Sequence, residues 1–136
     1  MFSSFIALAP AWASCRPLAL PTVGGQSFDE IAESLLPELK PLEGFVLLGE
    51  SFSGPIAARL SAAFSATEES LASHLSPPLL SILGTNDHLV SLSRSRAFFS
   101  RVPQSTVAEI EGPHLIVQTK PTEVWAAISE EFETAA

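Results

Sequence analysis

Residues 45–60 read FVLLGESFSGPIAARL, and this stretch decides how the rest of the chain is interpreted. Its opening apolar run ends at Gly49, which is typical of a strand buried on both faces of a parallel sheet. Apolar residues then recur at helical spacing from Ile56, and Pro55 suits the first turn of a helix. The stretch therefore predicts a strand, a sharp turn that carries Ser51, and a helix.

Strands and helices alternate on both sides of this stretch. Ser27 and Glu30 form a capping box at the start of one expected helix, and Pro37 is expected to break its last turn. The pattern predicts an α/β fold in layers of helix, sheet and helix, with a small, mainly parallel sheet in a single domain over residues 1–136. Further strands are expected at 15–20, 77–84 and 105–112, and helices at 2–9, 27–39, 65–75, 91–102 and 121–132.

Three chemically active side chains follow expected strands, where binding sites of parallel sheets lie. They are Ser51, Asp87 and His114. A hydroxyl becomes a strong nucleophile when a neutral imidazole takes its proton, and a carboxylate fixes the tautomer of that imidazole. The Phe52 backbone N–H, at the start of the next helix, would donate to a developing oxyanion. These residues predict nucleophilic acyl transfer.

Three segments carry a resemblance to the α/β-hydrolase superfamily. LLGESFSG resembles the nucleophile elbow, ILGTNDHLV the acid-bearing turn, and IEGPHLIVQTKPTEV the histidine loop. The resemblance covers most of the chain from about Cys15 and implies a truncated α/β-hydrolase core. It implies Ser51 as nucleophile, His114 as general base and acid, and Asp87 as orienting carboxylate, with no cofactor. The implied activity is hydrolysis of small carboxylic esters or thioesters through an acyl-enzyme.

The chain also departs from this pattern. Ser53 replaces the last glycine of G-x-S-x-G, and no loop that would supply a second oxyanion donor is matched. The short interval between Ser51 and Asp87 leaves a cap absent or reduced to a short helix near 65–75, with an open pocket. Two sheet positions beside the nucleophile strand are unfilled. Open strand edges invite pairing, so we expect a homodimer or a larger homo-oligomer.

Each site residue also has a structural interpretation. Ser51 suits a turn or helix cap, Asp87 a turn, and His114 a structural loop. An alternative function is therefore a catalytically impaired hydrolase remnant that serves as a binding or assembly module. A different reaction of a Ser-His-Asp site, such as perhydrolysis or C–C bond hydrolysis, is also compatible with the sequence.

The composition excludes other classes of function. With seven Lys and Arg, no basic run and a net charge of −8, the chain is not expected to bind nucleic acid. No apolar run reaches the roughly 18 residues of a membrane span. Three scattered histidines and the single Cys15 give no metal-ligand spacing, and a lone cysteine fits a reducing, cytoplasmic location. Residues 2–9 suit an amphipathic helix better than a secretory signal, because a basic n-region is missing and Pro10 interrupts the apolar run.

Overall fold

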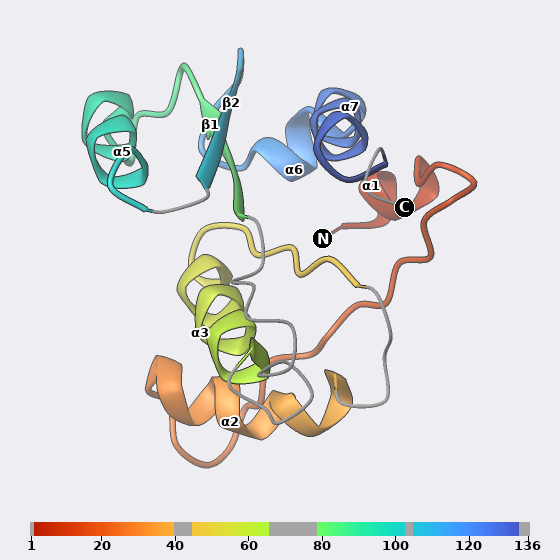
Figure 1. Cartoon of the computed structure of the whole chain (residues 1–136), viewed down its shortest axis with the longest axis vertical. Coiled ribbons are helices and arrows are strands. Elements are labelled where there is room, and N and C mark those ends of the chain that lie inside the picture. The colour runs from red at the N-terminus through yellow and green to blue at the C-terminus, as the bar shows by residue number, and fades with distance from the viewer. Residues whose placement is uncertain (1, 40–44, 66–78, 103–104, 134–136) are drawn as a thin grey trace. The chain divides into compact units, whose positions relative to one another are not determined.

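The computed structural model describes residues 2–39, 45–65, 79–102 and 105–133. These residues contain six helices and a two-stranded parallel sheet, so the architecture is broadly α/β (Figure 1). The elements are α1 (Ser3–Ala7), α2 (Phe28–Leu39), α3 (Ser53–Ser65), β1 (Leu79–Gly84), α5 (Leu92–Phe99), β2 (Ser105–Ile110), α6 (Ile116–Thr119) and α7 (Pro121–Phe132).

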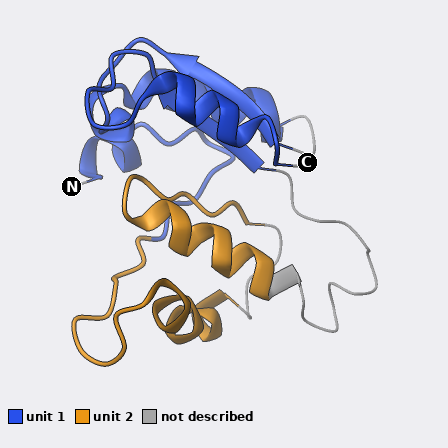
Figure 2. Cartoon of the chain, turned by 90° about the vertical axis from the view of Figure 1, so that its left-hand side faces the viewer, with its two compact units in different colours: residues 1–16, 78–136 blue, residues 17–77 orange. Residues whose placement is uncertain are grey.

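The chain divides into two compact units (Figure 2). Unit 1 comprises residues 1–16 and 78–136, and unit 2 comprises residues 17–77. Unit 1 therefore contains the sheet with α1, α5, α6 and α7, whereas unit 2 contains α2 and α3. The expected single domain over the whole chain stays a prediction.

Unit 1 is organised by the pairing of β1 with β2. The strands run parallel, in a register that begins at Leu79↔Ser105 and ends at Gly84↔Ile110. Figure 1 shows α5 on one side of the pair and α6 with α7 on the other. Leu80, Ile82 and Ile110 of the two strands pack against the buried cluster that contains Val124 of α7, which is fully buried. The strands and helices expected in this half of the chain are therefore confirmed within the described residues.

The short helix α1 is held on α7 by an aromatic contact. The rings of Phe5 and Trp125 are stacked, with centroids 4.4 Å apart. The Trp125 Nε1–H also donates a hydrogen bond to the Phe5 carbonyl oxygen at 2.7 Å. A helix is thus present near the start of the chain as expected, with Phe5 as its buried residue.

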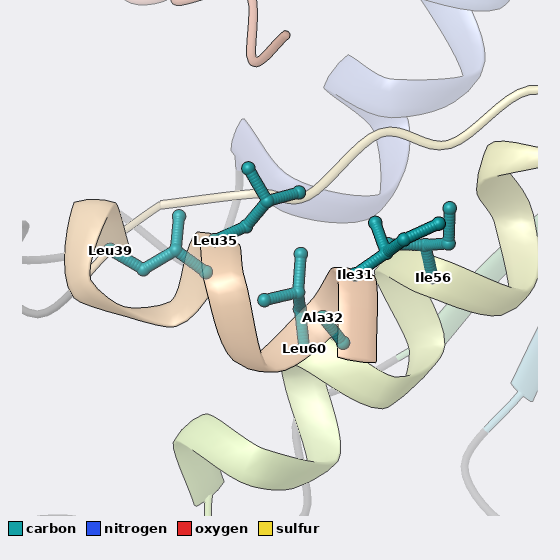
Figure 3. Packing of buried hydrophobic residues seen from close by; sticks show 6 residues of the cluster. All are labelled: Ile31, Ala32, Leu35, Leu39, Ile56 and Leu60. Carbon is teal, nitrogen blue, oxygen red and sulfur yellow. The ribbon is translucent and has the colours of Figure 1, made fainter. Parts of the chain in front are cut away.

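Unit 2 is built on the packing of α2 against α3. Helical spacing places a stripe of apolar side chains on the facing surfaces of both helices, as the sequence predicts. The capping box of α2 is also formed: the Ser27 hydroxyl donates to Glu30 Oε2 at 2.6 Å, and the Glu30 N–H donates to Ser27 Oγ at 3.3 Å. The buried cluster comprises Ile31, Ala32, Leu35, Leu39, Ile56 and Leu60 (Figure 3).

Two expected strands are wrong. Residues 15–20 and 45–49 lie in no strand: within the described residues the sheet consists of β1 and β2 alone. Phe45 and Leu47 nevertheless pack on the α2–α3 cluster, while Val46 and Leu48 are half-exposed. The segment 45–48 thus keeps the side-chain alternation of a strand without a ladder partner.

Two other expectations concern helix ends. Pro37 does not break α2, which continues to the buried Leu39. Leu39, two residues past this proline, is buried, and its burial offsets the backbone hydrogen bond that Pro37 cannot donate. The short helix expected at 65–75, and with it the reduced cap, lies outside the described residues beyond Ser65.

Across the described ranges, helices are too short or too polar to traverse a bilayer.

Candidate active site

Ser51 lies in a tight turn directly before α3. Its φ of 54° is in the left-handed region, and among the described non-glycine residues it alone has a positive φ. Such a conformation costs a serine on the order of 1–3 kcal/mol and persists where the surroundings enforce it. The strain at Ser51 therefore marks this turn as a candidate functional element.

Ser53, the residue that departs from the G-x-S-x-G pattern, closes this turn. Its hydroxyl accepts a hydrogen bond from the Glu50 N–H and donates one to the Glu50 carbonyl oxygen, both at 2.9 Å. The Ser53 N–H donates to the same carbonyl at 3.1 Å. The substitution therefore supplies contacts that a glycine could not make, and these contacts help to hold Ser51 in its strained conformation.

Gly49 allows the chain to enter the turn closely against α3. A Cβ at this position would lie 2.6 Å from the Ser53 carbonyl oxygen and 2.9 Å from Gly54 Cα, both backbone atoms. A side chain at residue 49 would thus force the turn apart. A Cβ at Gly54, by contrast, would make only an ordinary contact, with the Gly49 carbonyl oxygen at 3.9 Å. The first glycine of the motif, and not Gly54, is the one that close packing requires.

Phe52 follows Ser51 and precedes the first residue of α3. Its side chain is 56% exposed, and its ring lies 5.2 Å from that of Phe28. The N-terminus of a helix carries a partial positive charge, so the backbone near Phe52 is electrostatically suited to a developing anion.

In unit 1 the ends of the parallel strands bring Asp87 and His114 together. The pairing continues beyond the strands, since the Thr85 N–H donates to the Ile110 carbonyl at 2.9 Å and the Asn86 N–H to the Gly112 carbonyl at 3.0 Å. Asp87 Oδ2 and His114 Nδ1 then lie 2.7 Å apart. Both side chains are largely buried.

The carboxylate of Asp87 is also held by its own turn. Its second oxygen, Oδ1, accepts the N–H groups of Leu89 at 2.7 Å and Val90 at 2.9 Å. Burial raises the pKa of Asp87, but the hydrogen bonds from the Val90 N–H, His114 and the Leu89 N–H together lower it below its ordinary value. Asp87 is therefore ionised at neutral pH despite its burial.

An ionised carboxylate fixes the tautomer of the imidazole. Because a carboxylate can only accept hydrogen bonds, the His114 Nδ1 atom must donate in the contact with Asp87. In the neutral ring the other nitrogen, Nε2, then carries no proton and is the basic atom. This is the state that a general base requires.

The structure thus brings together two of the four predicted site residues, Asp87 and His114, in unit 1, whereas Ser51 and Phe52 lie in unit 2. Sequence reasoning did not single out Asn86 or the turn role of Ser53. The NDH tripeptide after an apolar strand is a signal that could have indicated a hydrogen-bonding turn.

The described residues contain no group of three or more His, Cys, Asp or Glu side chains that could hold a metal ion. His88, beside Asp87, is exposed, and His74 lies outside the described residues.

Searches against models of known protein families, curated proteins and solved structures find no significant match.

The lowered pKa of Asp87 predicts a pH-dependent stability. Its carboxylate stabilises the fold above the unfolded-state pKa of about 3.9, and this contribution is lost as the pH falls through the lower folded-state value. The free energy of unfolding of the native chain should exceed that of Asp87→Asn most at neutral pH. The difference should shrink below about pH 4, because a protonated aspartate resembles an asparagine.

Urea denaturation followed by circular dichroism at several pH values measures this difference. Asn86→Ala is the matched control, since it keeps the backbone N–H and removes no ionisable group. Its effect on the free energy of unfolding should be independent of pH. The prediction would be contradicted if the free energy of unfolding of Asp87→Asn also differed from that of the native chain by the same amount at every pH. The hydrogen bonds of Asp87 would then contribute equally whether or not its carboxyl group is ionised.

Proposed function

We propose that the chain is a serine hydrolase that cleaves carboxylic esters or thioesters through an acyl-enzyme, on a truncated α/β-hydrolase core. The observation that carries this proposal is the 2.7 Å contact between Asp87 Oδ2 and His114 Nδ1. That contact leaves Nε2 as the basic nitrogen, and it comes from the two residues that follow paired parallel strands.

In the proposed reaction Ser51 Oγ attacks the acyl carbonyl carbon, and its proton passes to His114 Nε2. The tetrahedral intermediate collapses when the protonated imidazole gives that proton to the leaving alcohol or thiol. Water, deprotonated by the same nitrogen, then attacks the acyl-enzyme and restores Ser51. Asp87 stabilises the imidazolium in both steps, and the Phe52 N–H donates to the oxyanion.

Support for Ser51 comes from the geometry of its own turn. A serine held at φ 54° before a helix, with a crowded Gly49 behind it, has the local features expected of a nucleophile elbow. The proposal requires Ser51 Oγ to reach His114 Nε2 in the folded protein. With a reduced cap, the substrate would be a small or surface-presented acyl group, and a reducing compartment such as the cytoplasm fits the single cysteine.

A second candidate is an impaired remnant that acts as an assembly module. The small sheet favours this candidate: parallel sheets are usually larger than two strands and covered on both faces, so the described sheet would be the remainder of a larger one.

Under either function we propose a homodimer or larger homo-oligomer that covers open strand edges. Static light scattering at low micromolar concentration should give a multiple of the 14.4 kDa chain mass, and the mass of one chain would contradict this.

The hydrolase proposal predicts that a small fluorophosphonate modifies Ser51 and inhibits ester cleavage. Intact-mass spectrometry should show one adduct on the native chain and on Ser34→Ala, which removes an exposed serine of α2. Ser51→Ala should show none and should lose ester hydrolysis by several orders of magnitude. A folded native chain that forms no adduct would contradict the proposal and favour the assembly module.

A further inference from the structure

Gly84, the last residue of β1, lies against the loop that carries the candidate base. We call residues 85–90 the acid turn and residues 111–115 the histidine loop. A Cβ at Gly84 would lie 2.5 Å from the Pro113 carbonyl oxygen and 2.6 Å from that of Gly112. Both are backbone atoms, which cannot rotate aside as the end of a side chain can. The end of β1 therefore approaches the histidine loop as closely as only a glycine allows.

Residue 84 is a glycine because there is no space for a side chain, and not because its backbone adopts a conformation that only glycine favours. Among the described glycines, Gly24 is the one with a φ in the left-handed region. Gly84 has the backbone of an ordinary strand residue and pairs with Ile110 in the parallel ladder. An alanine could adopt that backbone conformation, and only its methyl group would clash with the histidine loop.

The crowded atoms adjoin the two residues that form the candidate dyad. Pro113 directly precedes His114, and Gly84 accepts a backbone hydrogen bond from the Asp87 N–H at 3.3 Å. The Asn86 N–H donates to the Gly112 carbonyl at 3.0 Å, which ties the acid turn to the histidine loop at the same place. The acid turn and the histidine loop therefore contact each other through their backbones at the same place where the side chains of Asp87 and His114 lie 2.7 Å apart. We call this place the junction.

We propose that Gly84 is a positioning residue, whose missing side chain sets the distance between the acid turn and the histidine loop and so the Asp87–His114 hydrogen bond. An ordinary contact begins at 3.4 Å, so a methyl group 2.5 Å from the Pro113 carbonyl oxygen would displace that atom by about 0.9 Å. If the movement carries His114 away from Asp87, a shift of that size is enough to stretch the 2.7 Å hydrogen bond beyond the usual limit of roughly 3.2 Å. Gly84 therefore acts through His114 and touches no substrate.

Gly112 offers a matched control at the same junction. A Cβ there would meet the side-chain atoms Ile116 Cδ1 and Lys120 Cγ, and no backbone atom is among its close neighbours. Ile116 is buried, but its Cδ1 is the end of a side chain, which adjusts by side-chain rotation more readily than a backbone carbonyl does. Gly112→Ala thus adds the same methyl group to the same loop without pushing the two backbones apart.

Proton NMR of the chain labelled with ¹⁵N-histidine reads the hydrogen bond directly. The native chain should show a low-field Nδ1 proton that disappears in His114→Gln, which assigns it among the three histidines. Gly84→Ala should lose that resonance or shift it upfield while retaining a native circular dichroism spectrum. Gly112→Ala should keep it. An unchanged resonance in Gly84→Ala, or none in the native chain, would overturn the proposal.

The role in catalysis rests on the proposed hydrolase function, and a kinetic arm tests it separately. Gly84→Ala should lower kcat/KM for a small ester on the order of 10²-fold, mainly through kcat, because the base is misplaced. Gly112→Ala should stay within a few-fold of the native chain. A native chain that gives the expected NMR pattern but cleaves no ester would refute the hydrolase function and leave the positioning role intact.

A further pair of variants applies if Gly84→Ala does not fold. Pro113→Gly releases the fixed φ of the loop, so that Gly84→Ala combined with Pro113→Gly allows the loop to yield to the methyl group. Pro113→Gly alone should keep the low-field resonance, and the double variant should fold without it. A double variant with the native resonance would overturn the proposal.

Discussion

The parallel pairing of β1 with β2 is the constraint on which the candidate chemistry of unit 1 depends. Its register brings Gly84 opposite Ile110, so both strands end at the same level and the segments that follow meet side by side. Backbone hydrogen bonds from Thr85 and Asn86 extend this contact past the strands. On the α5 side, Arg96 holds Glu109 of β2 with two hydrogen bonds, at 2.5 and 2.6 Å. Apolar packing on the α7 side and the Arg96–Glu109 contacts on the α5 side both stabilise this register. The register in turn decides which side chains meet beyond the ends of the strands.

The two halves of the proposed site are held in different ways. Asp87 is fixed by three hydrogen bonds that also keep it ionised, so its placement and its charge have the same cause. Ser51 is instead held in a strained turn, where the hydroxyl of Ser53 and the close approach of Gly49 enforce an unfavourable φ. Hydrogen bonds thus hold the side chain of the candidate acid Asp87, whereas packing and hydrogen bonds of neighbouring residues hold the backbone of the candidate nucleophile Ser51.

Much of unit 1 could be predicted from sequence because its signals are local. The apolar run of β1, the β-branched residues of β2 and the apolar stripe of α7 each indicate their element without reference to the rest of the chain. Residues 45–49 have a similar composition but form no strand, because a strand is completed by hydrogen bonds to a partner that composition does not encode. The positions of Asp87 and His114 after two strands indicated that they would meet. The crowding at Gly84 depends on the register of the sheet and could not be read from sequence.

The proposed hydrolysis requires that the imidazole oriented by Asp87 act on Ser51. A crystal structure of the chain after reaction with a small fluorophosphonate would test this requirement, because the adduct fixes an oxygen where the leaving group would be. We expect a phosphonylated Ser51 with His114 Nε2 within about 3.2 Å of an adduct oxygen, while Nδ1 keeps its contact with Asp87. An adduct on another residue, or an imidazole beyond hydrogen-bond reach of the modified Ser51, would contradict it.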